Sequence, residues 1–330
     1  MEYRPFGSTE LQVSVIGFGA WAIGGPAMAG QTPIGWGPAD DGDSLRALRR
    51  AWDLGITFYD TADFYGLGHS EELIGSVFGN SPAVVIATKV GHRLGDAGKV
   101  VLDYSAGHIR RACEESLRRL RRDVIDYYQL HSAKLDHLKQ GECVEAMETL
   151  RAEGKIRYWG TSLNTFRPEI EGDYVLSHRL GDGLQCVLNV INQRAGAFVQ
   201  RARVTGYGII ARMPLQFGLL SGKFTRQTRF SPDDHRSFRL APELLASSLD
   251  ALEEVWPYAD AMSISRTSFS LSYCASIPGV STVIPGMRTP EQVESNTKDI
   301  RIFSPAQLSV LEQLYVNRLQ NLVTLFEQQG

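Results

Sequence analysis

The sequence contains few cysteines, and they are far apart. The four are Cys113, Cys143, Cys186 and Cys274, with no C-x-x-C pair among the 330 residues. This spacing argues against a disulfide scaffold, a cysteine zinc site and a thioredoxin-type redox motif. We therefore expect four buried, reduced thiols and no bound metal.

Long apolar runs and an excess of positive charge are also lacking. No run approaches the 18 residues that a membrane-spanning helix needs, and the first residues do not resemble a secretory leader. Lys and Arg number 34 against 37 Asp and Glu, a formal net charge of −3, so there is no basic surplus for nucleic-acid phosphates. These absences predict a cytoplasmic protein with a small-molecule substrate and no membrane or nucleic-acid partner. They leave monomer and homo-oligomer equally open.

The sequence does contain a repeated alternation of strand-like and helix-like segments. Eight apolar runs rich in β-branched residues occur at 13–18, 56–59, 84–88, 124–129, 156–159, 184–190, 207–211 and 282–284. Segments with apolar residues at helical spacing lie between them, most clearly at 44–54, 109–120 and 142–152. Alternating strands and helices predict a parallel sheet, and eight repeats predict a closed (β/α)8 barrel. We expect residues 1–330 to form one barrel domain with a C-terminal helical extension.

Two segments interrupt this alternation. Residues 24–43, after the first run, are rich in Gly and Pro, and residues 216–241, after the seventh, form a long polar stretch. Both follow the carboxyl ends of predicted strands, which is where barrel enzymes build their active sites. Loops of this length in a compact domain are usually functional.

Polar residues end three successive predicted strands. Asp60, Lys89 and His131 follow the second, third and fourth apolar runs, and Tyr65 lies just beyond the first of them. Each residue alone has an ordinary structural explanation, as a turn residue, a solvated charge or a packed ring. Neighbouring strands lie about 4.8 Å apart, however, so the four side chains can converge on one rim of the barrel.

These four residue types suit proton donation to a carbonyl oxygen. Tyrosine is a weak acid, with an ordinary pKa near 10, and a nearby ammonium lowers that pKa by stabilising tyrosinate. Lys89 can supply the ammonium, Asp60 can orient it, and His131 can hydrogen-bond the carbonyl. No metal and no Ser or Cys nucleophile is needed. The constellation therefore indicates hydride transfer to a carbonyl, with a nicotinamide as donor.

At these residues the sequence resembles the aldo-keto reductase superfamily, over about residues 3–314. The matching motifs are GITFYDTADFYG at 55–66, ATK at 87–89, DYYQLH at 126–131 and GKIRYWGTS at 154–162. The resemblance implies a TIM barrel that uses NADPH or, more rarely, NADH. It makes Tyr65 the general acid, supported by Asp60, Lys89 and His131. The chain is more similar to the bacterial and plant branch than to the mammalian one.

The resemblance also implies a set of cofactor-binding residues. Ser162 and Gln185 match positions that hold the nicotinamide carboxamide. The expected pyrophosphate loop contributes Arg212, Leu215, Gly218, Ser221 and Lys223, and the expected adenosine end contributes Gly286, Arg288, Gln292 and Asn296. Two departures stand out: Arg212 replaces an aromatic residue common beside the nicotinamide, and Gly286 and Gln292 replace cations near the 2′-phosphate. Arg288 is left as the clear cation there, so we expect NADPH and leave NADH open.

The substrate wall is predicted to be aromatic. Trp21 lies just before residues 24–43 and Trp36 within them, Phe64 precedes Tyr65, and Phe217 lies near the start of the second long loop. Such a wall favours aldehydes or ketones with a hydrophobic body.

Three alternatives remain at this point. GFGAWA at 17–22 fits a dinucleotide-binding G-x-G-x-x-A pattern, but a Rossmann helix would have to begin where the sequence is full of Gly and Pro. Some aldo-keto reductase folds serve as NADPH-sensing regulatory subunits of potassium channels, with a similar tetrad. A sugar dehydrogenase working in the oxidative direction would also use the same four residues.

Overall fold

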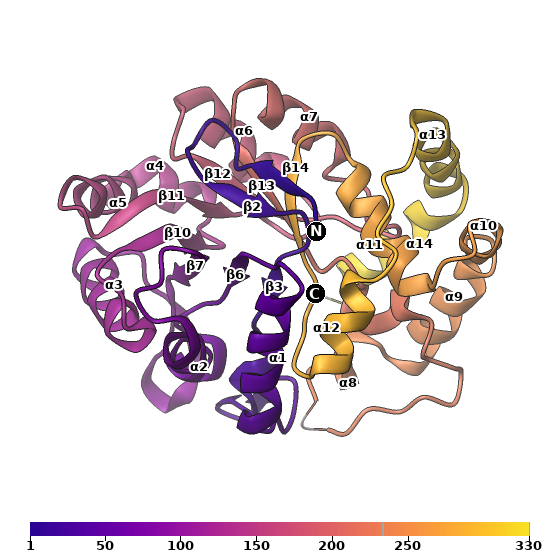
Figure 1. Ribbon diagram of the computed structural model, residues 1–330, viewed down its shortest axis with the longest axis horizontal. Coiled ribbons are helices and arrows are strands. Elements are labelled where there is room, and N and C mark those ends of the chain that lie inside the picture. The colour runs from indigo at the N-terminus through magenta and orange to yellow at the C-terminus, as the bar shows by residue number, and fades with distance from the viewer. Residues whose placement is uncertain (233, 330) are drawn as a thin grey trace.

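Eight parallel strands form a barrel that follows the order of the chain. The computed structural model describes residues 1–232 and 234–329, and its main sheet has the order β14-β13-β12-β11-β10-β7-β6-β3. Two isolated parallel bridges, Ile16 to Val283 and Gly19 to Gly286, bring the first and last strands together. The strands are β3 (Phe18–Gly19), β6 (Phe58–Asp60), β7 (Val85–Val90), β10 (Ile125–His131), β11 (Ile156–Ser162), β12 (Gly183–Val187), β13 (Gly208–Arg212) and β14 (Val280–Ile284). The predicted (β/α)8 barrel is confirmed (Figure 1).

Helices surround the barrel, and most of them bury part of their apolar surface. The predicted helices 44–54, 109–120 and 142–152 are confirmed as α1, α3 and α5, and α13 and α14 confirm the C-terminal extension. The helices around the first half of the barrel are α1 (Asp41–Asp53), α2 (His69–Phe78), α3 (Ala106–Leu120), α4 (Leu135–Gln140), α5 (Glu142–Ala152) and α6 (Glu169–His178). The rest are α7 (Gly196–Val204), α8 (Arg236–Arg239), α9 (Pro242–Leu252), α10 (Trp256–Ala261), α11 (Arg266–Ser276), α12 (Pro290–Thr297), α13 (Pro305–Leu314) and α14 (Gln320–Gln328). Among the described residues, no helix is both long and apolar enough to cross a bilayer.

The first predicted strand, 13–18, is wrong in its extent. Its beginning belongs to β2 (Gln12–Ser14), which pairs antiparallel with β1 (Tyr3–Pro5), and only β3 joins the barrel. The Ser14 hydroxyl donates to the Ile16 carbonyl at 2.7 Å, a local contact that separates the two strands. The sixth predicted strand, 184–190, ends early at Val187, because the Asn189 side chain accepts from two backbone N–H groups just beyond it and turns the chain.

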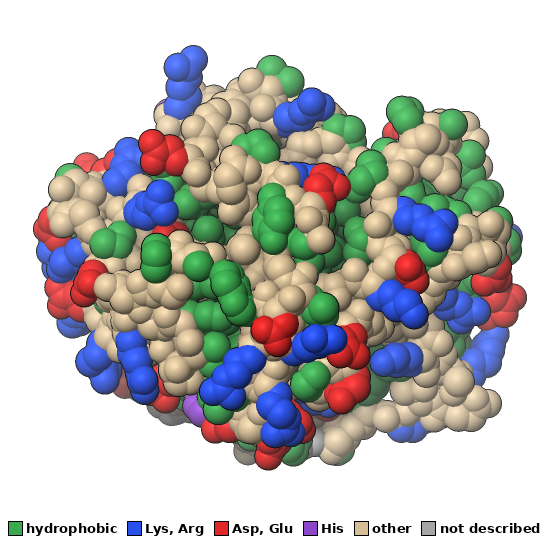
Figure 2. Space-filling model, in the orientation of Figure 1, with side chains coloured by type: hydrophobic (Ala, Val, Ile, Leu, Met, Phe, Trp, Pro, Cys, Tyr) green, Lys and Arg blue, Asp and Glu red, His purple; other side chains and the backbone are tan. Residues whose placement is uncertain are grey.

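The β1–β2 hairpin closes the end of the barrel that faces the viewer in Figure 1. Phe6, in its turn, is fully buried among barrel side chains, with its ring 4.9 Å from that of Tyr127 and 6.2 Å from that of Phe58. A Cβ at Gly183 or Gly208 would lie 2.6 or 2.5 Å from the Phe6 ring. Those two strand glycines therefore provide the space that the ring fills. On the face seen in Figure 2, Lys and Arg side chains are mixed with Asp and Glu side chains, and no large patch carries charge of one sign.

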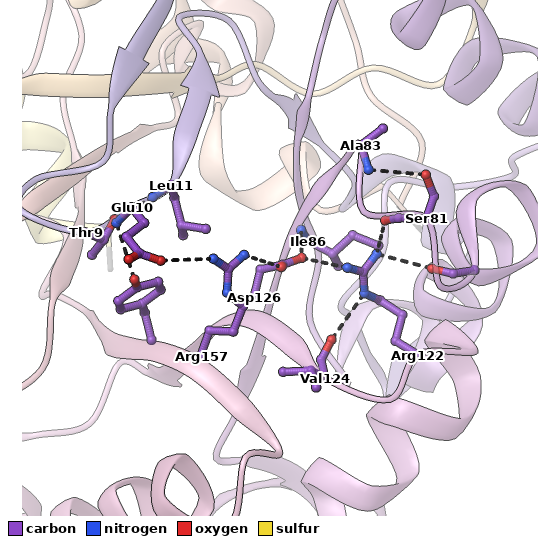
Figure 3. A network of polar contacts seen from close by, with 12 residues as sticks. Thr9, Glu10, Leu11, Ser81, Ala83, Ile86, Arg122, Val124, Asp126 and Arg157 are labelled. Atoms are coloured by element: carbon purple, nitrogen blue, oxygen red, sulfur yellow. Dashed lines mark hydrogen bonds and ion pairs between the residues drawn. The ribbon is translucent and has the colours of Figure 1, made fainter.

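A polar network joins the strands at the same end (Figure 3). Asp126, near the start of β10, accepts from the Ile86 backbone N–H and from Arg122 at 2.9 Å each, and from Arg157 at 3.2 Å. Arg122 also donates to the Val124 carbonyl at 3.2 Å. Asp126 is 5% exposed and each of its carboxylate oxygens accepts a hydrogen bond, so its buried charge is satisfied. These hydrogen bonds hold neighbouring strands together at this end of the barrel.

Three insertions stand at the opposite end, after the carboxyl ends of strands. The two predicted long loops hold the hairpin of β4 (Met28–Ala29) with β5 (Thr32–Pro33), and helix α8. A third insertion, the hairpin of β8 (His92–Leu94) with β9 (Val100–Leu102), follows β7 and was not predicted. These insertions border the site described next.

Phe6→Ala should lower the free energy of unfolding by about 3–5 kcal/mol, because it empties a closely packed site between two glycines. Urea unfolding followed by fluorescence measures the change. Val204→Ala is the control, since Val204 is 87% exposed and its truncation should cost under about 0.5 kcal/mol. Equally small losses in the free energy of unfolding of both variants would show that Phe6 does not fill a closely packed site at this end of the barrel.

Candidate active site

The carboxyl ends of the strands open into a cavity of about 690 Å³. Three of the four catalytic candidates line it, together with all of the residues predicted for the cofactor and for the aromatic wall. The exception is Lys89, which lies behind Tyr65 with its side chain fully buried. The structure therefore brings the predicted residues together in one place.

Lys89 is the centre of the polar contacts below the cavity. Its ammonium donates to Asp60 Oδ2 at 2.6 Å, to the Thr61 carbonyl at 2.7 Å and to the Tyr65 hydroxyl at 3.2 Å. An ammonium has three N–H donors, so all of them are used. The Lys89 and Asp60 side chains are 0% and 3% exposed, which makes this a buried ion pair.

The second oxygen of Asp60 is held by two glutamines. Gln129 and Gln185 donate to Asp60 Oδ1 at 3.0 and 2.8 Å. Gln185 was predicted to hold a nicotinamide carboxamide; it does line the cavity, but its amide nitrogen donates to the Asp60 carboxylate and to the Gln129 side-chain oxygen. Gln129 was missed, although it stands in the DYYQLH motif, as a polar residue inside an otherwise apolar strand. Together the amides and the ammonium satisfy the buried charge.

Tyr65 keeps its proton in this environment. Burial raises its pKa and outweighs the Lys89 ammonium, which lowers it, so the pKa of Tyr65 stands above its ordinary value. The expectation of a lowered pKa considered the ammonium and omitted the burial. The pKa of Lys89 is also raised, because Asp60 and Tyr65 together outweigh the opposing effect of burial. The hydroxyl and the ammonium are thus both protonated at neutral pH.

His131, the last residue of β10, is neutral. Burial chiefly, and then His92, Lys89 and Arg212, hold the pKa of His131 well below its usual range. Its ring lies edge-on to the Tyr65 ring, with centroids 5.8 Å apart. A neutral imidazole carries one N–H that can donate to a carbonyl oxygen. His92, which comes from the unpredicted hairpin and stacks on His131 at 4.2 Å, also lines the cavity and was missed.

Aromatic side chains from the two long loops meet beside the cavity. The ring centroid of Trp21 lies 5.2 Å from that of Trp36 and 6.0 Å from that of Tyr65. The indole N–H of Trp21 donates to the Ile34 carbonyl at 3.0 Å. The ring centroids of Trp36 and Phe217 are 6.1 Å apart, so side chains of the two long loops pack against each other. Phe64 lines the cavity as well. Further lining residues that the sequence reasoning missed are Phe166, His235, Arg236, Arg239 and Phe326.

Cations dominate the charged lining of the cavity. The described lining residues include five, namely Arg212, Lys223, Arg236, Arg239 and Arg288, against one acid, Asp60, which is paired with Lys89. The Arg212 guanidinium donates to the Leu163 carbonyl and the Thr165 hydroxyl, and its Nε is buried without a partner. Arg236 is paired with Asp234. This excess of positive charge suits an anionic ligand.

The first turn of α12 faces the same cavity. Thr289 caps the helix, the Gln292 side chain accepts from the Arg288 N–H at 2.9 Å, and Asn296 donates to the Gly286 carbonyl at 3.3 Å. A helix N-terminus beside an arginine favours phosphate groups. The hydrogen-bond donors at the α12 end of the cavity therefore fit the phosphates of a dinucleotide. Among the described residues, no three His, Cys, Asp or Glu side chains are grouped to hold a metal ion.

Comparison with known proteins agrees with this geometry. Residues 15–315 match the Aldo/keto reductase family. The uncharacterized oxidoreductase YqkF of Bacillus subtilis is 30% identical over 298 residues, covering 90% of each chain. A probable voltage-gated potassium channel subunit beta of Arabidopsis thaliana is 26% identical, covering 95% of this chain and 96% of its own. Among solved structures, the glycerol dehydrogenase of Gluconobacter oxydans superposes with a TM-score of 0.80 at 27% identity, covering 96% of this chain and 95% of its own.

Lys89→Met should lower the free energy of unfolding by about 3–5 kcal/mol, because it leaves the Asp60 carboxylate buried without its cation. Urea unfolding measures this. The double variant Asp60→Asn, Lys89→Met should recover part of the loss, since no unpaired charge remains. Lys99→Met, at an exposed position, is the matched control. A double variant less stable than Lys89→Met alone would contradict the ion-pair account.

Proposed function

The chain belongs to the aldo/keto reductase family, and we propose that it reduces an aldehyde or ketone to an alcohol with NADPH, or runs the reverse reaction. We propose further that residues 1–330 act as one barrel domain in the cytoplasm. The observation that carries the proposal is the 3.2 Å hydrogen bond from the buried Lys89 ammonium to the Tyr65 hydroxyl, beside a neutral His131. This arrangement suits an acid that must release a proton to a carbonyl oxygen.

The proposed cofactor fits the charge of the cavity. Arg288 and the first turn of α12 would hold the 2′-phosphate at the adenosine end, and Lys223 and Ser221 the pyrophosphate. Ser162 and Arg212 line the cavity from the ends of β11 and β13, where the nicotinamide would lie. When bound, the reduced nicotinamide supplies the electron pair. Five lining cations favour the more highly charged NADPH, and NADH stays as the alternative cofactor.

The chain's own residues then complete the proposed reaction. The neutral His131 and the Tyr65 hydroxyl both donate to the carbonyl oxygen, which fixes its position. As negative charge develops on that oxygen, Tyr65 passes over its proton, and the Lys89 ammonium stabilises the tyrosinate that remains. Asp60 and its two glutamines hold the ammonium in place. The aromatic side chains of the two loops exclude water from the site.

The lining also bears on the substrate. Trp21, Trp36, Phe64 and Phe217 offer apolar surface next to the proposed acid, so a carbonyl compound with a hydrophobic body is favoured. The same four polar residues serve either direction of the reaction. Oxidation of a sugar or polyol is therefore the alternative, and the likeness to a glycerol dehydrogenase supports it.

A regulatory subunit that binds the cofactor is the second candidate. The likeness to a probable potassium channel subunit beta favours it, since such a protein can keep the same fold. Binding of NADPH without turnover of any carbonyl would move the assignment to this candidate.

Tyr65→Phe should reduce turnover of 4-nitrobenzaldehyde by roughly 10²–10⁴-fold while leaving NADPH affinity nearly unchanged, because it removes only the proton donor. Loss of NADPH absorbance measures turnover, and cofactor fluorescence measures binding. Tyr207→Phe is the matched control, since that hydroxyl donates to the Val175 and Leu180 carbonyls away from the cavity. Full turnover in Tyr65→Phe would refute the proposed acid.

Arg288→Met should raise the dissociation constant of NADPH about 10- to 100-fold, the loss of one charge-assisted contact of about 1.5–3 kcal/mol. The dissociation constant of NADH should change much less, because NADH lacks the 2′-phosphate. Titration of cofactor fluorescence gives both values. Arg49→Met, on the exposed face of α1, is the control. An equal loss for the two cofactors would show that Arg288 does not read the 2′-phosphate.

A further inference from the structure

The unpredicted β8–β9 hairpin places a second imidazole against His131. The ring centroids of His92 and His131 are 4.2 Å apart and the planes differ by 22°, so the rings stack. Phe64 approaches His92 edge-on at 5.6 Å. The three rings form a column along one side of the cavity, and His92 and Phe64 are held there by elements outside the barrel strands.

Few polar groups surround the His131 ring beside its stacked partner. The groups facing His131 are Lys89 from β7, Arg212 from β13 and the Tyr65 ring, and the Tyr104 hydroxyl donates to its backbone carbonyl at 2.6 Å. No carboxylate is among these groups in the described part of the chain. A protonated His131 would therefore stand close to two cations with no carboxylate beside it, which is unfavourable.

His92 is itself held neutral. Burial chiefly, with the Lys134 and Lys89 ammonium groups, lowers the pKa of His92 to about 4. The stacked partner thus adds no charge near neutral pH and acts as an uncharged cover. Its ring occupies space that water would otherwise fill above the face of His131.

We propose that His92 is a positioning residue for His131: the stacked ring fixes the plane of His131 and shields it from water, so that His131 stays a neutral hydrogen-bond donor. The proposal rests on the proposed function for its catalytic meaning, but the stack and the protonation state of His131 can be measured without turnover. Any flat apolar ring at position 92 should serve, because the role is one of covering and not of proton exchange.

Two substitutions separate covering from proton exchange. His92→Phe keeps a flat ring and removes the ionisable nitrogens, whereas His92→Ala removes the ring. NMR titration of the histidine ring protons follows the charge of His131, whose signals are assigned by their loss in His131→Asn. His178→Ala is the matched control, because His178 stacks on Tyr174 at 4.0 Å on the exposed surface of α6.

We expect the unaltered protein, His92→Phe and His178→Ala to share one titration behaviour for His131, with its pKa held below the ordinary value, and to keep the chemical shifts that ring stacking causes. In His92→Ala we expect the pKa of His131 to rise toward its ordinary value, since water reaches the ring. The acidic limb of the pH profile of kcat/KM should move to higher pH in His92→Ala alone.

Two results would overturn the proposal. One is a His131 that titrates in His92→Ala as it does in the unaltered protein. The other is a His92→Phe variant that titrates as His92→Ala does, which would assign the effect to the nitrogens of His92. Failure of the proposed function is distinguishable, because it would appear as unchanged turnover in Tyr65→Phe whatever the NMR titration shows.

Discussion

The buried ion pair between Lys89 and Asp60 is the constraint on which the site depends. Two charges at 0% and 3% exposure are stable only when every donor and acceptor has a partner. The ammonium achieves this with Asp60, the Thr61 carbonyl and the Tyr65 hydroxyl, and the carboxylate with Gln129 and Gln185. The position of the Tyr65 hydroxyl is thus a consequence of satisfying a buried cation.

The two ends of the barrel divide stability and chemistry between them. At one end, Phe6 fills the space above two strand glycines and Asp126 joins three strands through saturated contacts. At the other end, the insertions after β3, β7 and β13 supply aromatic rings and cations around a cavity of about 690 Å³. Packing contacts therefore gather at the closed end, and the residues proposed for chemistry gather at the open end.

Much of this could be predicted from the sequence, for a physical reason. Residues that end parallel strands share one rim, so the positions of Asp60, Lys89 and His131 followed from the order of apolar runs alone. Gln129 could not be found in this way, since a buried amide inside an apolar run has no periodic signal. His92 lies in a short hairpin whose existence depends on tertiary contacts. Whether the pKa of Tyr65 is raised or lowered depends on how deeply the side chain is buried, and the sequence positions of its charged neighbours do not give that depth.

We propose that Tyr65 and His131 hold a carbonyl that would be reduced by hydride from a bound nicotinamide. The most direct test is single turnover of 4-nitrobenzaldehyde with NADPH deuterated stereospecifically at C4, followed by mass spectrometry of the alcohol, with each of the two C4 diastereomers in turn. The account predicts one deuterium on the carbinol carbon from one diastereomer and none from the other. Bound cofactor with no labelled alcohol from either would contradict it and would favour a cofactor-binding subunit.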